Sequence, residues 1–120
     1  MAGLSVLVES ADDGKSSRTV VRVAGEADAT TGALRETLAA EAARRPGLLL
    51  VEMSGLTFID SSALSVVLKL HRELDGSGCA FALVSPSTAV ARVLQLVGAD
   101  RVIPIYGSVD EASGLRPGSA

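Results

Sequence analysis

The chain has 120 residues, 48% of them hydrophobic, which is enough for one domain with a single core. Its aromatic residues are limited to Phe58, Phe81 and Tyr106, so the stacking platforms of single-strand nucleic-acid binders are missing. The 11 basic and 14 acidic residues give a formal net charge of −3. No basic cluster suited to a phosphate backbone occurs, which argues against a nucleic-acid partner.

The single cysteine and single histidine limit the chemistry available to the chain. Cys79 has no partner for an internal disulfide, and its apolar sequence neighbours predict a buried, unreactive thiol. One Cys and one His cannot form a cluster of metal ligands, so we expect neither a metal nor a cofactor. No apolar run reaches the roughly 20 residues that span a bilayer, and the first residues lack the basic leader of a secretory signal. We therefore expect a cytoplasmic protein without membrane association.

The first half of the chain predicts two strands, a helix and a third strand. Residues 4–9 and 18–25 are strand-like, and the polar link between them suits a hairpin turn. Residues 31–45 are rich in Ala, Leu, Glu and Arg and predict a helix that ends at the Pro-Gly pair that follows. Residues 48–53 form an almost wholly apolar run, typical of a strand that is covered on both faces.

The second half continues the alternation of helices and strands. A helix from Asp60 to about Asp75 precedes an apolar strand at residues 79–84. Residues 101–106 predict a last strand, which Pro104 places at a sheet edge. A third helix between these two strands has the following expected parts: Ser85 or Ser87 as cap, Pro86 in the first turn, Val90, Val93, Leu94 and Val97 on one face, and Gly98 at the end.

The predicted order is β-β-α-β-α-β-α-β in a single α/β domain over residues 1–112. Strands joined through a helix are normally parallel, whereas two strands joined by a hairpin are antiparallel. We therefore expect a mixed, mostly parallel sheet of about four to five strands, with an antiparallel first hairpin and helices packed on the sheet. Residues 108–112 add one helical turn, and residues 113–120 form a disordered tail.

The stretch FIDSSAL at residues 58–64 places an acid and two hydroxyls at the start of an apolar helix. Asp60 is a good N-cap, because its carboxylate can accept from the free backbone N–H groups of the first turn. Ser61 and Ser62 then flank the exposed side of the helix, and both hydroxyls should reach solvent. At about 100° per residue, the buried stripe comprises Ala63, Val66, Val67, Leu70 and Leu74, opposite Ser65, Lys69 and Arg72.

Leu64 and Leu68 fall at the edge of this stripe, next to Ser61. An exposed serine beside a partly exposed leucine pair predicts a docking surface. A helix start also stabilises an anion by about 0.3–1 kcal/mol, and a phosphoserine brings about −1.5 to −2 charges. From these residues alone, Ser61 can be a modification switch or only part of the helix start, and both interpretations stay open.

Two segments resemble the STAS domain of bacterial anti-sigma factor antagonists, the family of the sporulation and stress-response antagonists. VEMSGLTFIDSSAL at residues 51–64 is similar to the family's apolar strand, short turn and Asp-Ser-Ser-Gly-Leu signature. GEADATTGALRETL at residues 25–38 is similar to its Gly-Glu-aliphatic-Asp segment leading into the first helix. The resemblance covers about residues 4–112. Three positions depart from the pattern: Ala63 stands where the family usually has Gly, Ala27 replaces a larger aliphatic residue, and Gly32 falls where a better helix former is common.

The resemblance implies a small cytoplasmic regulator that is not an enzyme. Unphosphorylated members of the family bind an anti-sigma factor and so free the sigma factor that it held. That anti-sigma factor is also a serine kinase with a histidine-kinase-like ATPase fold. It phosphorylates the antagonist, which then dissociates, and a serine phosphatase can reset the cycle. We expect the free protein to be a monomer.

Carried onto this sequence, the resemblance makes Ser61 the phosphorylation site, with Ser62 as the second candidate. It places Gly25, Glu26 and Asp28 in the loop beside Ser61, where they help to form the partner surface. The resemblance gives no catalytic residue and no metal ligand. The residues of the expected partner surface are Gly25, Glu26, Asp28, Asp60, Ser62, Leu64, Ser65 and Leu68.

Two other functions are considered for the same residues. A serine-based enzyme needs a base near Ser61, but the only histidine, His71, lies ten residues further along the predicted helix, about 15 Å away. This spacing argues against a Ser-His-acid triad. The stronger rival is a STAS scaffold or accessory module without a phosphorylation cycle, in a stress-signalling assembly or in lipid or small-ligand transport.

Overall fold

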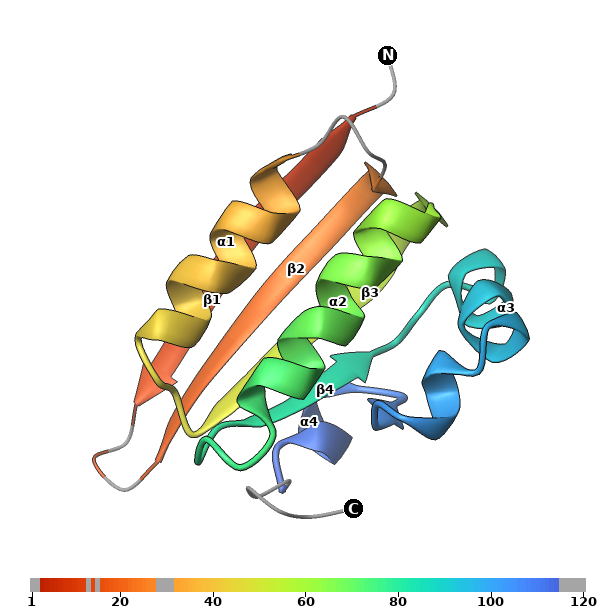
Figure 1. Cartoon of the computed structure of the whole chain (residues 1–120). Helices are drawn as coiled ribbons and strands as arrows, with labels where there is room; N and C mark the ends of the chain where they lie inside the picture. Colours follow the sequence, from red (N-terminus) through yellow and green to blue (C-terminus); the bar gives the residue numbers. More distant parts are fainter. Residues whose placement is uncertain (1–2, 13, 15, 28–31, 115–120) are drawn as a thin grey trace.

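The structure, a computed structural model, describes residues 3–12, 14, 16–27 and 32–114 (Figure 1). Within these residues the chain alternates strands and helices in nearly the order that the sequence predicts. The strands are β1 Leu4–Asp12, β2 Ser17–Ala27, β3 Leu48–Ile59, β4 Ala80–Val84 and β5 Ile105–Tyr106. The helices are α1 Gly32–Ala43, α2 Ser61–Leu74, α3 Thr88–Leu96 and α4 Val109–Ala112, with a 3₁₀ turn η1 at Ala99–Arg101.

The strands form one mixed sheet in the order β1-β2-β3-β4-β5. β1 and β2 pair antiparallel through a hairpin, and the other three pairs are parallel. Each parallel pair is joined by a helical crossover, as parallel neighbours require. The predicted fold class, a single mixed α/β domain with an antiparallel first hairpin, is confirmed.

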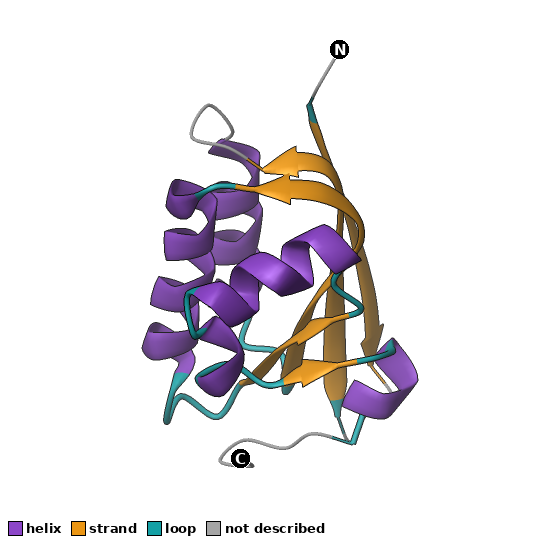
Figure 2. Ribbon diagram, turned by 90° about the vertical axis from the view of Figure 1, so that its right-hand side faces the viewer, coloured by secondary structure: helices purple, strands orange, loops and turns teal. Residues whose placement is uncertain are grey.

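The two faces of the sheet are covered unequally. Figure 2 shows α1 and α2 on one side of the sheet and the short α4 on the other. The larger core lies under α1, α2 and α3, and includes Val21, Leu49, Val51, Phe81 and Leu83 from the strands. A smaller core lies under α4, and includes Val20, Leu48, Leu50, Ala82 and Val84. Because successive side chains of a strand point to opposite faces, central strands covered on both sides read as continuous apolar runs.

β3 is twice as long as the sequence predicted, because its partner β2 is also longer. The prediction ended this strand at residue 53, but pairing with β2 continues to Ile59 opposite Ala27. The register shifts twice along this extension. Gly55 sits there because a Cβ atom on it would come within 2.9 Å of the Ala24 Cβ atom.

The predicted last strand over residues 101–106 is wrong at its beginning. The chain forms η1 at Ala99–Arg101, and only Ile105–Tyr106 pair with β4. Pro104 has no N–H to donate, but its carbonyl accepts from the Leu83 N–H at 3.0 Å, so the hydrogen bonding to β4 begins at this carbonyl. The expected edge position is confirmed, since β5 ends the strand order.

The third helix, α3, differs from the prediction in where it begins and in which residues are exposed. Ser87 is the cap, its hydroxyl accepting from the Val90 N–H at 3.3 Å, so Pro86 precedes the helix rather than lying in its first turn. The Ser85 hydroxyl instead donates to the Gly107 carbonyl. Val97 was expected on the same face as Val90 and Leu94, which are buried, but it is 56% exposed, because the helix ends at Leu96 and the chain turns at Gly98.

After β5 the chain forms one short helix. α4 supplies the expected helical turn at Val109–Ala112. Ser113 is still held by side-chain hydrogen bonds, accepting from Arg18 at 2.8 Å and donating to the Val109 carbonyl at 2.7 Å. The tail was expected from residue 113, and residues 115–120 lie outside the described part of the chain.

The core of the larger layer gives a stability prediction. Leu49 is 0% exposed in β3, so Leu49→Ala should lower the free energy of unfolding by about 2–5 kcal/mol through lost burial and a residual cavity. Leu7 is 60% exposed, and Leu7→Ala should change it by no more than about 0.5 kcal/mol. Urea unfolding followed by circular dichroism measures both. Equal effects of the two substitutions would contradict the assigned packing.

Candidate functional site

The site lies where β2 and β3 end together and α2 begins. The backbone N–H of Asp60 donates to the Ala27 carbonyl at 3.0 Å, which closes the β2-β3 pairing at this edge. Asp60 has extended backbone geometry, and its Oδ1 accepts from the Ala63 N–H at 2.9 Å. Asp60 is therefore the N-cap of α2, as predicted, and it couples the sheet directly to the helix start.

The three serines of the first turn have different partners. Ser61, Ser62 and Ser65 are all exposed, as predicted. The Ser62 hydroxyl donates to Asp60 Oδ1 at 2.8 Å, and the Ser65 hydroxyl donates to the Ser61 carbonyl at 2.8 Å. The Ser61 hydroxyl makes no hydrogen bond within the described part of the chain. Of the three, Ser61 is thus the hydroxyl most available for reaction.

The electrostatics of the helix start favour an exposed anion only in part. The free N–H groups of α2 give its first turn a partial positive charge, and no acidic residue lies within that turn. The Asp60 carboxylate already satisfies the Ala63 N–H, so a phosphate on Ser61 would add to an existing negative charge. The modification would therefore concentrate negative charge on the outer surface of the site rather than fill a vacant binding position.

The glycine-glutamate segment lies on a strand and not in a loop, which corrects the prediction. Gly25 pairs with Leu56 and Glu26 with Phe58 near the end of β2. Both are half-buried and approach the same edge as Asp60. Asp28, expected beside them, lies outside the described residues.

A glycine is required at position 25, where β1 begins beside the end of β2. Its φ angle is +99°, and a Cβ atom on it would lie 1.9 Å from the Gly3 carbonyl oxygen. That same oxygen accepts from the Glu26 N–H at 3.0 Å. A side chain at this position would displace the start of β1, so the glycine has a structural reason independent of any partner.

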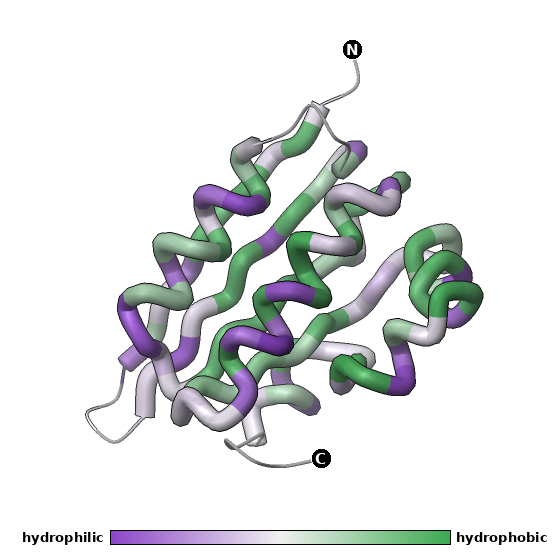
Figure 3. Tube along the Cα trace, viewed as in Figure 1, coloured by the Kyte–Doolittle hydropathy of each residue, from purple (hydrophilic) through white to green (hydrophobic). Residues whose placement is uncertain are grey.

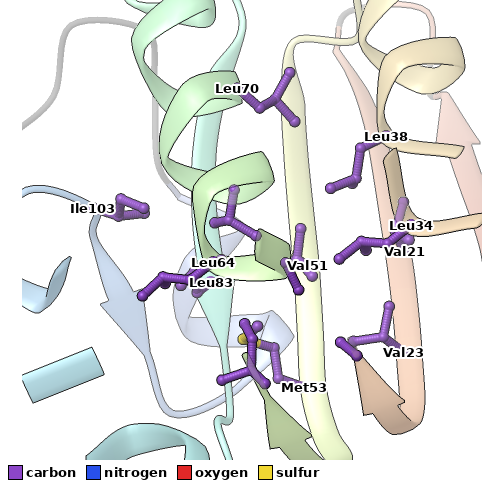
Figure 4. Close-up of a cluster of buried hydrophobic side chains, with 14 of the residues drawn as sticks. Val21, Val23, Leu34, Leu38, Val51, Met53, Leu64, Leu70, Leu83 and Ile103 are labelled. Carbon is purple, nitrogen blue, oxygen red and sulfur yellow. The ribbon is translucent and has the colours of Figure 1, made fainter. Parts of the chain in front are cut away.

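The prediction that Leu64 is partly exposed is wrong. Leu64 is 6% exposed and belongs to the larger core (Figure 4). Figure 4 shows it near Leu83, on the side of α2 that faces Ile103. Val66, expected to be buried, is half-buried instead. Leu64 is therefore a packing residue, whereas Leu68 is half-buried and keeps a place at the surface.

The remainder of α2 follows the predicted amphipathic pattern. Figure 3 shows hydrophobic and hydrophilic residues interleaved along this helix. Ala63, Val67, Leu70 and Leu74 are buried, and Lys69 and Arg72 are exposed. His71 is half-buried and packs against Phe81 with a ring-centroid distance of 6.3 Å. It lies on the same unbroken helix as Ser61, so the predicted separation of the two side chains is retained.

Phe58 is a surface residue of the site that the sequence reasoning missed. It is 47% exposed at the end of β3, directly opposite Glu26. Strand alternation would have placed Phe58 on the same face as the buried Leu56, but the structure buries Leu56 and Ile59 and leaves Thr57 and Phe58 exposed, so the sequence pattern did not show it. An exposed aromatic ring at an edge with a free hydroxyl is suited to a protein contact.

The single cysteine is buried as predicted. Cys79 is 7% exposed, and burial raises the pKa of its thiol above the ordinary value. The neutral thiol is therefore favoured at neutral pH, and reaction with electrophiles should need a higher pH than for an exposed cysteine.

Comparison with known proteins agrees with this geometry. The STAS domain model matches residues 2–112. The chain belongs to the STAS domain family. A 60-residue segment is 42% identical to a Thermotoga maritima protein, covering 50% of this chain and 53% of that protein, so this match spans about half of the relative's length.

Solved STAS structures share the whole fold. A crystal structure of an anti-sigma factor antagonist from Mycobacterium paratuberculosis superposes with a TM-score of 0.81 at 30% identity, covering 93% of this chain and 92% of that one. The Bacillus cell-fate determinant SpoIIAA in its phosphorylated form has a TM-score of 0.62 at 22% identity, covering 90% and 97%. Its unphosphorylated form gives a TM-score of 0.67 at 24% identity, covering 89% and 93%. The SpoIIAA likeness concerns the fold.

None of the helices in the described STAS domain is both long and apolar enough to cross a membrane. The longest described helix, α2, is amphipathic, with one face in the core and one in solvent.

The cap of α2 gives a second stability prediction. Asp60→Ala should lower the free energy of unfolding by about 0.5–2 kcal/mol, because the Ala63 N–H loses its acceptor. Asp60→Asn should retain most of this stability, because an Asn oxygen can accept the same hydrogen bond. Thermal or urea unfolding measures both.

Asp75 at the other end of α2 provides the matched control. It is exposed, and its carboxylate lies at the negative end of the helix dipole. Asp75→Ala should be neutral or slightly stabilising. A loss for Asp75→Ala as large as that for Asp60→Ala would show that charge removal, not capping, is being measured.

Proposed function

We propose that this chain is an anti-sigma factor antagonist that acts in the cytoplasm and is switched by phosphorylation of Ser61. In its unphosphorylated form it binds an anti-sigma factor, which is also a serine kinase with a histidine-kinase-like ATPase fold, and so frees a sigma factor. Phosphorylation of Ser61 releases the antagonist, and a serine phosphatase restores it. The chain itself is a regulator and not an enzyme, and it is a monomer when free.

The observation that carries this proposal is the state of the Ser61 hydroxyl. It is exposed at the start of α2 and makes no hydrogen bond to a described residue, whereas the Ser62 hydroxyl is bonded to Asp60. The anti-sigma factor antagonist from Mycobacterium paratuberculosis supports the same function, and SpoIIAA is known in both a phosphorylated and an unphosphorylated form.

The proposed partner surface surrounds Ser61 at the ends of β2 and β3. Its described residues are Gly25, Glu26, Phe58, Asp60, Ser62, Ser65 and Leu68, and Asp28, which lies outside the described residues, is proposed to contribute to it. A phosphoserine here carries about −1.5 to −2 charges. Against an acidic partner group about 4 Å away, each unit charge repels by on the order of 4 kcal/mol at a near-surface dielectric. Since about 1.4 kcal/mol is tenfold in affinity, a part of this repulsion suffices to dissociate the complex.

A charge substitution at Ser61 tests the proposal. The chain and its Ser61→Asp and Ser61→Ala variants are used to capture partners from lysate of the host bacterium, with mass spectrometry of what is retained. The chain and Ser61→Ala should retain a histidine-kinase-like ATPase. Ser61→Asp should bind the purified ATPase at least tenfold more weakly, because one carboxylate reproduces part of the phosphate charge.

Thr88→Asp is the matched control for this experiment. Thr88 is exposed and is the first residue of α3 after its cap Ser87, so it repeats the local setting of Ser61 at another helix start. It should leave ATPase affinity within about twofold. If the chain and Ser61→Asp retain the same partners and no such ATPase, the switch is refuted and the domain is a scaffold or accessory module.

A further inference from the structure

A groove runs between α1 and α2, and among its lining residues only Ser65 also belongs to the surface assigned to the protein partner. Its volume is about 690 Å³, within the usual range of small-molecule sites. Figure 1 shows the two helices side by side on the same face of the sheet. Its apolar lining, called the floor here, includes Leu38 and Ala42 from α1, Val66 and Leu70 from α2, and Cys79.

The groove is open because the α1 side chains that face it are small. Ala39, Ala42 and Ala43 all line it, while Leu38 points into the core at 1% exposure. Between these helices, alanines leave the space that larger side chains would fill at the usual packing distance of about 8–10 Å. Val66 of α2 is correspondingly only half-buried at the groove wall.

The rim of the groove is cationic in a chain that is acidic overall. Arg35, Arg45 and Lys69 line it, against the single carboxylate of Glu73, although the chain has a formal net charge of −3. Lys69 is 4.0 Å from Glu73, a loose exposed pair. Within the described residues, neither Arg35 nor Arg45 has a carboxylate at ion-pair distance. An anionic ligand would therefore find unpaired positive charge above an apolar floor.

We propose that this groove binds a single-chain fatty acid, with the acyl chain on the apolar floor and the carboxylate at the Arg35–Lys69 rim. The lining residues include no aromatic side chain on which a nucleotide base could stack. They also present side chains rather than a free strand edge, so the groove offers no template for an extended peptide. The proposal is independent of the Ser61 switch.

Titration calorimetry with a chain-length series tests the apolar floor. Octanoate, decanoate and dodecanoate are used below the concentrations at which they aggregate. Binding should be saturable with one site, and affinity should rise about fourfold for each buried methylene, or about fifteenfold for each step of two. Dodecanol, which has the same chain without the charge, should bind at least tenfold more weakly than dodecanoate.

Two pairs of variants locate the ligand. Ala39→Phe fills the groove and should abolish dodecanoate binding, whereas Ala40→Phe, on an exposed position of α1 that does not line the groove, should leave it unchanged. Arg35→Gln combined with Lys69→Gln should weaken binding at least tenfold. Arg92→Gln combined with Arg101→Gln removes two exposed charges elsewhere and should not weaken it.

Cys79 supplies an independent readout, because it is the single cysteine of the chain and lines the groove. Dodecanoate should slow its reaction with a maleimide, with half the effect at the dissociation constant from calorimetry. The proposal is overturned if no saturable binding occurs, if Ala39→Phe binds as well as the unchanged chain, if dodecanol equals dodecanoate, or if Cys79 is not protected. It is also overturned if sedimentation shows a dimer that Ala39→Phe dissociates, because a second copy would then cover the groove.

Discussion

The hydrogen bond from the Asp60 N–H to the Ala27 carbonyl is the constraint on which the site depends. It joins the ends of β2 and β3, and so it fixes where the described pairing of these two strands stops. The side chain of the same residue then accepts from Ala63 and starts α2. Asp60 thus belongs to the sheet through its backbone and to the helix through its carboxylate. Ser61 is the first residue after this junction, and its position in space is set by both layers.

This junction explains why neighbouring serines differ in availability. The same Asp60 Oδ1 that accepts from the Ala63 N–H also accepts from the Ser62 hydroxyl. The Ser61 carbonyl, which has a second lone pair beside its helical hydrogen bond, accepts from the Ser65 hydroxyl. Both bonds stabilise the first turn, and both use hydroxyls that would otherwise be reactive. The Ser61 hydroxyl is exposed and makes no hydrogen bond to a described residue. A modification there can alter the surface without removing a bond that holds the helix start.

The sequence predicted the order of the elements, the cap at Asp60 and the exposed side of α2, because caps and periodicity are local properties. It did not predict the full length of β3, since the residues from Ser54 to Phe58 are kept extended by pairing with β2 and not by their own apolar pattern. The composition of residues 101–104 predicted a strand, but the chain first forms η1 at Ala99–Arg101, and hydrogen bonding to β4 begins at the Pro104 carbonyl. Asp28 and the tail from residue 115 lie outside the described residues.

The placement of α2 between its neighbouring helices explains both the wrong predictions of burial for Leu64 and Val66 and the presence of the groove. A helical wheel assumes that the helix lies symmetrically on the sheet. In the structure α2 buries Leu64 on the side of Leu83 and Ile103, while the alanines of α1 leave Val66 without a full cover on the other side (Figure 4). The spacing of α2 between its two neighbours is a property of all three helices, so no reading of α2 alone could give it. The alanine-rich segment at residues 39–43 carries the missing information, since small side chains on one helix predict open space beside the next.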